Sequence, residues 1–172
     1  MTLNVRKGTL EDVTAVMALL KQSQQQLNLS GSPQWSGTDG PQEEEIRTHI
    51  LNQRLYIFLI EGTLLGTAVM TDVPETAYHT IQFGAWEKKE IPYLSIHRFA
   101  IAPEENGKGY AKLFLTLLIQ LGKRQGYNDI RIDTHPVNHS MQRVILANGF
   151  LFKGVIQLPI ANGERYAYQL TF

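Results

Sequence analysis

The sequence contains no cysteine among its 172 residues, which excludes disulfides, cysteine nucleophiles and thiolate metal sites. Its 16 basic and 16 acidic side chains balance, so no basic field favours nucleic acid or a membrane surface as a partner. The longest apolar stretches, LYIFLI and LFLTLLIQL, are well short of the about 20 residues that span a membrane. No apolar signal segment opens the sequence, and we therefore expect a cytoplasmic protein.

Motifs of metal and hydrolase chemistry are also lacking. The histidines do not follow a zinc-ligand spacing such as H-E-x-x-H, and Pro136 opposes a common helix for His135 and His139. The sequence has no G-x-S-x-G motif, so a serine hydrolase is poorly supported. We expect no metal ion in this protein.

The composition is that of an ordinary globular protein, with 43% hydrophobic and 19% charged residues. The length suits a single domain that covers residues 1–172. The hydrophobic patterns predict the order β-α-α-β-β-β-α-β-α-β-β. This is a mixed α/β (α+β) chain with a βαβ unit in its centre and a hairpin at its end.

The first half of the chain predicts two helices after an alternating strand at residues 2–8. Thr9 and Asp12 have the spacing of a capping box at the start of the first helix. The apolar residues that should form its buried face are Val13, Val16, Met17 and Leu20. Three glutamates at 43–45 suit the first turn of a second helix, which should bury Ile46 and Ile50.

Strand patterns dominate the middle of the chain. Glu61-Gly62 predicts a hairpin between two β-rich runs within residues 54–70. Residues 79–86 and 93–101 are expected to form two further strands, with a charged turn at 87–92 between them.

The last third begins with a predicted helix that should end near Gly126. One side of this helix carries Leu113, Phe114, Leu117, Leu118 and Leu121. A strand at 129–134 and a short helix at 138–150 follow. Two closing strands surround Asn162-Gly163, a tight-turn signal, and they leave an edge that could pair with a second copy in a homodimer.

The turn between the strand at 93–101 and the next helix contains two glycines, Gly107 and Gly109. The N-terminus of a helix presents free backbone N–H groups at its positive end, and glycine lets an anion approach them closely. Ala111 is small, and Lys108 and Lys112 add positive charge. The turn therefore favours a phosphate ligand.

Several interpretations of this turn can be compared. A P-loop would need G-x-x-x-x-G-K-[ST], which is absent. A dinucleotide-binding turn would need a small residue where Lys112 stands, although Asp129 has the spacing of its acidic partner. A glycine corner without any ligand, flanked by solvated lysines, is the structural alternative.

A third kind of phosphate loop matches better. NGKGYA, residues 106–111, resembles the [Q/R]-x-x-G-x-[G/A] signature of the GCN5-related N-acetyltransferases (GNAT family), with Asn106 in the first position. FAIAP before it and NHSMQRVILANGF after it resemble two further motifs of that family. PQW and PYLSIHR resemble a branch of small bacterial members. The resemblance implies the GNAT fold, in which a twisted mixed sheet of about seven strands is splayed between strands 4 and 5 and carries four helices on its faces.

The resemblance also implies acetyl-CoA as the cosubstrate, with direct attack of an amine on its thioester. The pantetheine arm would pair with the backbone of the fourth strand, and the pyrophosphate would take N–H groups of the glycine turn. The residues that the resemblance places at CoA are Phe99, Ala100, Ile101, Asn106, Gly107, Lys108, Gly109, Tyr110, Ala111, Lys112, Asn138 and Met141.

The proton transfers are less well defined by the sequence. His97 is the candidate base because the intrinsic pKa of histidine is near neutral, and a structural histidine is the alternative. Many GNAT enzymes have a tyrosine acid seven positions after the asparagine that Asn138 matches, but this chain has Ile145 there. Solvent or Ser140 could substitute. A catalytically weak CoA-binding or sensing module is therefore the alternative function.

The acceptor is expected to be the primary amine of a small molecule or of a peptide or protein. Trp35, Tyr78 and Trp86 are its candidate contacts, because exposed aromatic rings suit a flat or cationic group. Coverage of the core is the alternative role for these rings. Arg98 is a candidate ion-pair anchor.

Overall fold

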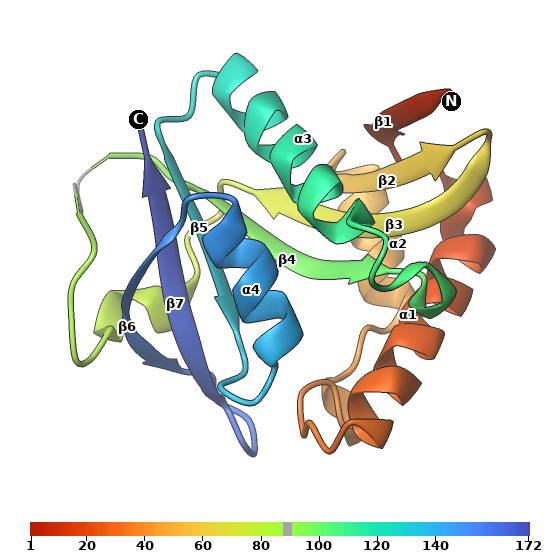
Figure 1. Cartoon of the computed structure of the whole chain (residues 1–172). Helices are drawn as coiled ribbons and strands as arrows, with labels where there is room; N and C mark the ends of the chain where they lie inside the picture. Colours follow the sequence, from red (N-terminus) through yellow and green to blue (C-terminus); the bar gives the residue numbers. More distant parts are fainter. Residues whose placement is uncertain (88–90) are drawn as a thin grey trace. The chain divides into compact units, whose positions relative to one another are not determined.

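The computed structural model of the chain describes residues 1–87 and 91–172. Within that part, seven strands and four α-helices follow the predicted order (Figure 1). The strands form one mixed sheet with the order β1-β2-β3-β4-β5-β7-β6, in which β4 and β5 are parallel, so the mixed α/β class is confirmed. The chain divides into two compact units, Met1–Met70 with His97–Phe114 (unit 1) and Thr71–Ile96 with Leu115–Phe172 (unit 2). A single domain stays a prediction.

Unit 1 contains the antiparallel strands β1 (Leu3–Lys7), β2 (Leu55–Ile60) and β3 (Thr63–Thr71). Only the last residue of β3, Thr71, belongs to unit 2. The predicted hairpin joins β2 to β3. Glu61 and Gly62 both have positive φ angles, of 48° and 78°, which matches the twist of a two-residue hairpin turn.

Two helices cover one face of this sheet, α1 (Val13–Leu29) and α2 (Glu43–Leu51). The N–H of Thr9 donates to the Asp12 carboxylate at 2.7 Å, so the predicted capping interaction forms before α1. The helices bury the residues that their periodicity predicts. The core between helices and strands consists of Val13, Val16, Met17, Leu19, Leu20, Ile46, Ile50, Leu55, Ile57, Val69, Ala100 and Ala102.

Unit 2 contains β5 (Asp129–Thr134), which pairs in parallel with the first part of β4 (Leu94–Ile101) and antiparallel with β7 (Glu164–Thr171). The parallel register runs from Leu94↔Ile130 to Ile96↔Ile132. β6 (Leu151–Gln157) pairs with β7 and is an edge strand. The helix α4 (His139–Ala147) contacts β5, as Figure 1 shows.

The helix α3 (Tyr110–Arg124) begins in unit 1 and continues into unit 2. It ends where the sequence predicts, since Gly126 has a φ angle of 92° and Tyr127 N donates to Gly122 O at 3.1 Å. Its buried face is centred on Phe114, Leu115 and Leu118. The predicted Leu113, Leu117 and Leu121 are half-buried beside it.

The prediction of a strand at residues 79–86 is wrong. Thr76–Thr80 is a 3₁₀ helix, and Gln82 forms an isolated antiparallel bridge with Val155 of β6. Packing decides this segment: the rings of Tyr78 and Trp86 pack in a tilted arrangement with their centroids 5.0 Å apart, and Trp86 Nε1 donates to the backbone oxygen of Tyr78. Such contacts override the β-propensity of the run. Residues 88–90 of the predicted charged turn lie outside the described residues.

Candidate functional site

The glycine turn lies in unit 1, between the end of β4 and the start of α3. A 3₁₀ turn at Pro103–Glu105 leads into it, and Leu113 N donates to Gly109 O at 3.1 Å in the first turn of the helix. Helix geometry then leaves the N–H groups of Tyr110 and Ala111 without intrahelical acceptors. These groups lie at the positive end of the α3 dipole, which favours an anion.

Both glycines have backbone conformations that a side chain would strain. Gly107 and Gly109 have φ angles of 80° and 84°, and no described atom lies within 4 Å of where a Cβ would stand on either. Lys108 Nζ pairs with Glu105 at 2.9 Å on the surface of the same turn. The turn thus presents open space and backbone donors together, with the exposed side chain of Lys112 nearby.

The strand before the turn is fixed by packing on both faces. Phe99 stacks on Phe114 of α3 with centroids 5.3 Å apart, and Ala100 packs in the core with α1 and α2. A Cβ on Gly66 of β3 would stand 3.2 Å from both Ala100 O and Phe114 Cδ1, so β3 packs closely against this part of β4 and α3. The backbone of Phe99–Ile101 is therefore held rigidly before the glycine turn.

Comparisons with known proteins identify the family to which the chain belongs. A family model described as the acetyltransferase (GNAT) family matches residues 22–150. A crystal structure of a GNAT-family acetyltransferase from Streptococcus agalactiae is 30% identical, with 99% of this chain and 95% of that chain covered and a TM-score of 0.90. The chain belongs to the GNAT family of acetyltransferases.

More distant GNAT structures share the fold. An acetyltransferase from Listeria monocytogenes is 24% identical over 99% of this chain and 95% of that chain, with a TM-score of 0.77. The PaiA N-acetyltransferase from Thermoplasma acidophilum, solved in complex with coenzyme A, is 15% identical over the full length of both chains, with a TM-score of 0.71. No curated protein sequence matches the chain significantly.

The residues that the GNAT resemblance places at CoA fall into both units. All but two lie in unit 1, along one stretch from Phe99 to Lys112. Asn138 and Met141 lie in unit 2, where Asn138 is the N-cap of α4 and its Oδ1 accepts from Met141 N at 3.1 Å. The asparagine thus begins a helix, as the sequence predicts.

Ile145, which stands where many GNAT enzymes have a tyrosine, is fully buried in α4. Its side chain contributes packing and has no proton to donate. His97, the candidate base, is half-buried in β4 and belongs to unit 1.

Arg98, next to His97, adopts a left-handed conformation with a φ angle of 50° that the sequence did not predict. Its Nε and Nη2 donate to the two carboxylate oxygens of Glu45 at 3.0 Å each, and Nη1 donates to Asp39 O at 3.2 Å. Its guanidinium carbon lies 5.7 Å from the centroid of the Trp35 ring. Arg98 is therefore the ion-pair anchor that the sequence allowed, and it ties β4 to α2 and to the segment before α2.

We expect this anchor to make the protein sensitive to acid. Burial alone would raise the pKa of Glu45, but hydrogen bonds from His49 and Arg98 lower it from 4.5 to about 2. A lowered folded-state pKa gives stabilisation that is complete above about pH 4.5 and is lost as the pH falls toward about 2. A third of the Glu45 side chain is exposed to solvent, which screens its charge, so we expect the free energy of unfolding to fall by about 1–2 kcal/mol.

Urea unfolding of wild type and Glu45→Gln between pH 6 and pH 2.5 measures this loss. The variant should be less stable at pH 6, and the difference should shrink on acidification. Glu44→Gln, an exposed neighbour on α2, is the matched control and should follow wild type. A stability difference between Glu45→Gln and wild type that does not change with pH would contradict the prediction.

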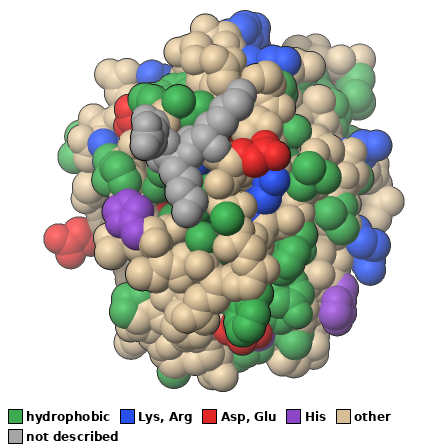
Figure 2. Space-filling view, turned by 90° about the vertical axis from the view of Figure 1, so that its left-hand side faces the viewer, with side chains coloured by type: hydrophobic (Ala, Val, Ile, Leu, Met, Phe, Trp, Pro, Cys, Tyr) green, Lys and Arg blue, Asp and Glu red, His purple; other side chains and the backbone are tan. Residues whose placement is uncertain are grey.

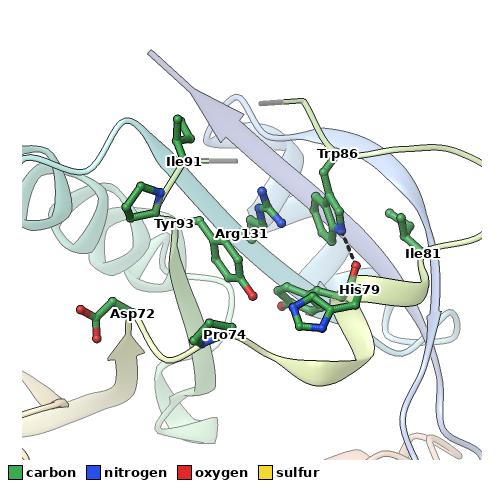
Figure 3. A pocket seen from close by; sticks show the side chains of 10 residues that line it. Asp72, Pro74, His79, Ile81, Trp86, Ile91, Tyr93 and Arg131 are labelled. Atoms are coloured by element: carbon green, nitrogen blue, oxygen red, sulfur yellow. Dashed lines mark hydrogen bonds between the residues drawn. The ribbon is translucent and has the colours of Figure 1, made fainter. Parts of the chain in front are cut away.

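The aromatic residues that were predicted to contact the acceptor lie in different units. Trp35 is half-buried in unit 1 beside Arg98, whereas Tyr78 and Trp86 are buried in unit 2 at 1% and 6% exposure. The latter two are thus not the exposed rings that the sequence predicted. Together with Tyr93, they line a pocket of about 500 Å³ (Figure 3).

Sequence reasoning missed Arg131, which also lines this pocket. Its guanidinium carbon lies 3.9 Å from the Tyr93 ring centroid and 4.4 Å from the Trp86 ring centroid. The available signal was the alternation of Asp129, Arg131 and Asp133 in an otherwise apolar strand, which places three charges on one face of β5.

Charged side chains are scattered over the face of the molecule that Figure 2 displays, with acidic, basic and histidine groups interspersed. In the described part of the chain, no helix is long and apolar enough to cross a membrane. The same residues contain no cluster of three or more potential metal ligands.

Proposed function

We propose that this GNAT protein transfers the acetyl group of acetyl-CoA to the primary amine of a small molecule, peptide or protein. The observation that carries the proposal is the glycine turn, where two left-handed glycines, open space and free helix N–H groups form a site suited to a pyrophosphate. The family supports the reaction class. The Thermoplasma acidophilum relative with the same fold was solved with coenzyme A.

In this proposal the backbone N–H groups of residues 106–112 hold the pyrophosphate, with Lys108 and Lys112 as nearby positive charges. The backbone of Phe99–Ile101 pairs with the pantetheine arm, because an extended ligand can hydrogen-bond to a strand edge. Asn138 and Met141 supply contacts from the start of α4. The rigid packing of Phe99 on Phe114 would hold the thioester at a fixed position.

The reaction itself needs little covalent chemistry from the protein. The amine nitrogen forms a bond to the thioester carbonyl carbon and then loses a proton to solvent, the C–S bond breaks, and CoA leaves as a thiolate. A backbone N–H of β4 stabilises the negative charge that develops on the carbonyl oxygen. The ammonium form of the acceptor, with a pKa of about 10.4, must first lose a proton, and solvent or Ser140 protonates the thiolate in the absence of a tyrosine.

We assign the deprotonation of the acceptor to His97. His97→Gln is expected to lower kcat/KM about 100-fold at pH 7 and to remove the acid limb of the pH–rate profile, because general bases contribute on this scale. CoA affinity, measured by calorimetry, should stay unchanged, since the CoA contacts in the proposal are elsewhere on β4. A variant with the pH–rate profile of wild type would exclude His97 from proton transfer.

Trp35 remains a predicted contact of the acceptor, whereas Tyr78 and Trp86, which the sequence also predicts as contacts, are buried beside Arg131 in the pocket of unit 2 and are left out of this proposal. Homodimerisation through the edge of the sheet also stays a prediction, with β6 as the edge strand concerned. A cytoplasmic location is the third prediction that the sequence alone supports.

The second candidate function is a CoA-binding or sensing module with weak catalysis. Buried Ile145 favours it, because the side chain at this position cannot act as an acid. Acetyl-CoA is mixed with the protein and a panel of polyamines, amino acids and peptides, and free thiol is followed. Amine-dependent thiol release supports the enzyme, and CoA binding without such release supports the module. Absence of CoA binding would contradict both functions.

A further inference from the structure

The pocket of unit 2 combines a buried basic group with apolar walls. Figure 3 shows side chains of the segment between β3 and β4 around Arg131 of β5. The exposed or half-buried side chains of the rim are Asp72, Pro74, His79, Ile81, Ile91 and Pro92. Its volume of about 500 Å³ is within the range of small-molecule sites.

Arg131 is 3% exposed and its donors are only partly used. The Asp129 carboxylate, which is completely buried, accepts from Nη2 at 2.8 Å and from Nε at 3.2 Å. Nη1 has no hydrogen-bond partner among the described residues, although its two N–H groups are strong donors. Nη1 is not one of the fully buried side-chain atoms that lack a partner, so its N–H groups are accessible from the pocket, where a ligand or water can accept from them.

The aromatic rings around Arg131 are fixed by hydrogen bonds of their own. Trp86 Nε1 donates to Tyr78 O at 2.7 Å, and the Tyr93 hydroxyl accepts from Glu75 N at 2.8 Å. The Tyr78 hydroxyl donates to Asp133 at 2.7 Å, and burial together with Asp133 raises the pKa of Tyr78 well above its ordinary value. These bonds hold the walls in place before any ligand arrives, which lowers the entropic cost of binding.

The arrangement favours a ligand that accepts hydrogen bonds over one that donates them. The Trp86 and Tyr93 rings are already occupied by the Arg131 guanidinium, so they cannot form a cage for an external ammonium group. The carboxylate oxygens nearby already accept hydrogen bonds, although these bonds leave their negative charges in place: Asp72 accepts from Tyr127, Asp133 from Tyr78, and Glu75 from Ala77 N. The donors left for a ligand are those of Arg131 Nη1, which match a carboxylate.

We propose that this pocket binds a small carboxylate with an apolar body, with the carboxylate on Arg131 Nη1 and the body against the isoleucine and proline side chains of the rim. None of the lining residues belongs to the set that we place at CoA. The proposal therefore does not depend on acetyl transfer, and it is tested without acetyl-CoA.

The test is calorimetric titration of the full chain with phenylacetate and 3-phenylpropionate, each compared with its amide, and with phenethylamine. We expect at least one of the acids to bind with a submillimolar dissociation constant. Its amide should bind at least about tenfold more weakly, and phenethylamine should not bind. Equal affinity for acid and amide, tighter binding of the amine, or no binding of either acid would overturn the proposal.

Two variants locate the binding. Asp129→Asn combined with Arg131→Met removes both members of the buried ion pair, so that no isolated charge unfolds the protein, and should weaken acid binding at least about tenfold. Ile91→Trp should do the same by filling the pocket without changing a charge. Val73→Trp, at an exposed residue that does not line the pocket, is the matched control. Unchanged acid affinity in both test variants would place the ligand elsewhere and refute the proposal.

Discussion

Replacing Gly109 by tryptophan is expected to weaken the binding of CoA at least about 100-fold, which corresponds to about 2.7 kcal/mol. Gly109 has a φ angle of 84°, and a tryptophan at this position would strain the backbone because its Cβ crowds the following carbonyl oxygen. The new ring would also fill the open space above the N–H groups of α3, where we place the pyrophosphate. Calorimetric titration of CoA into the variant measures the loss directly.

Gly62→Trp separates the steric effect from the backbone strain. Gly62 also lies in unit 1, has a φ angle of 78° and has no described atom within 4 Å of a Cβ position, but it lies in the hairpin between β2 and β3. The control should lose stability to a similar extent and retain CoA affinity. If Gly109→Trp also retained that affinity, the glycine turn would not be the phosphate site.

Arg131→Met is expected to lower the free energy of unfolding by about 3–5 kcal/mol, the range found when one member of a buried ion pair is removed. Asp129 is completely buried and would keep a negative charge without its partner. The variant would also lose the stacking of the guanidinium on Trp86 and Tyr93. Equilibrium unfolding in urea at neutral pH gives the difference.

The double variant Asp129→Asn, Arg131→Met is the informative control for this prediction. An amide in place of the carboxylate removes the unpaired charge, so most of the lost stability should return. Arg6→Met removes the cation of a partly exposed ion pair with Asp12, and it should lower the free energy of unfolding by about 1 kcal/mol or less. An Arg131→Met variant as stable as Arg6→Met would show that the buried pair contributes little to the fold.

Local features of the sequence were sufficient to predict the order of elements, several of their ends and the glycine turn. The buried faces of α1 and α2 follow from the spacing of residues such as Val16 and Ile50. The end of α3 at Gly126 and the hairpin at Glu61-Gly62 follow from backbone preferences of single residues. The glycine turn was visible because Gly107 and Gly109 lie two positions apart between a strand and a helix.

Tertiary structure decided what depends on residues far apart in the chain. Residues 79–86 carry a strand pattern, but Trp86 packs on Tyr78 and the segment follows those contacts instead. The anchor of Arg98 needs Glu45, 53 positions earlier, and the support of Tyr78 needs Asp133, 55 positions later. The sequence by itself thus determined most of the elements and the glycine turn, because helix periodicity and glycine conformations are local properties. Only the folded chain decided that Arg131 lies between two aromatic rings, because that arrangement depends on which distant segments pack together.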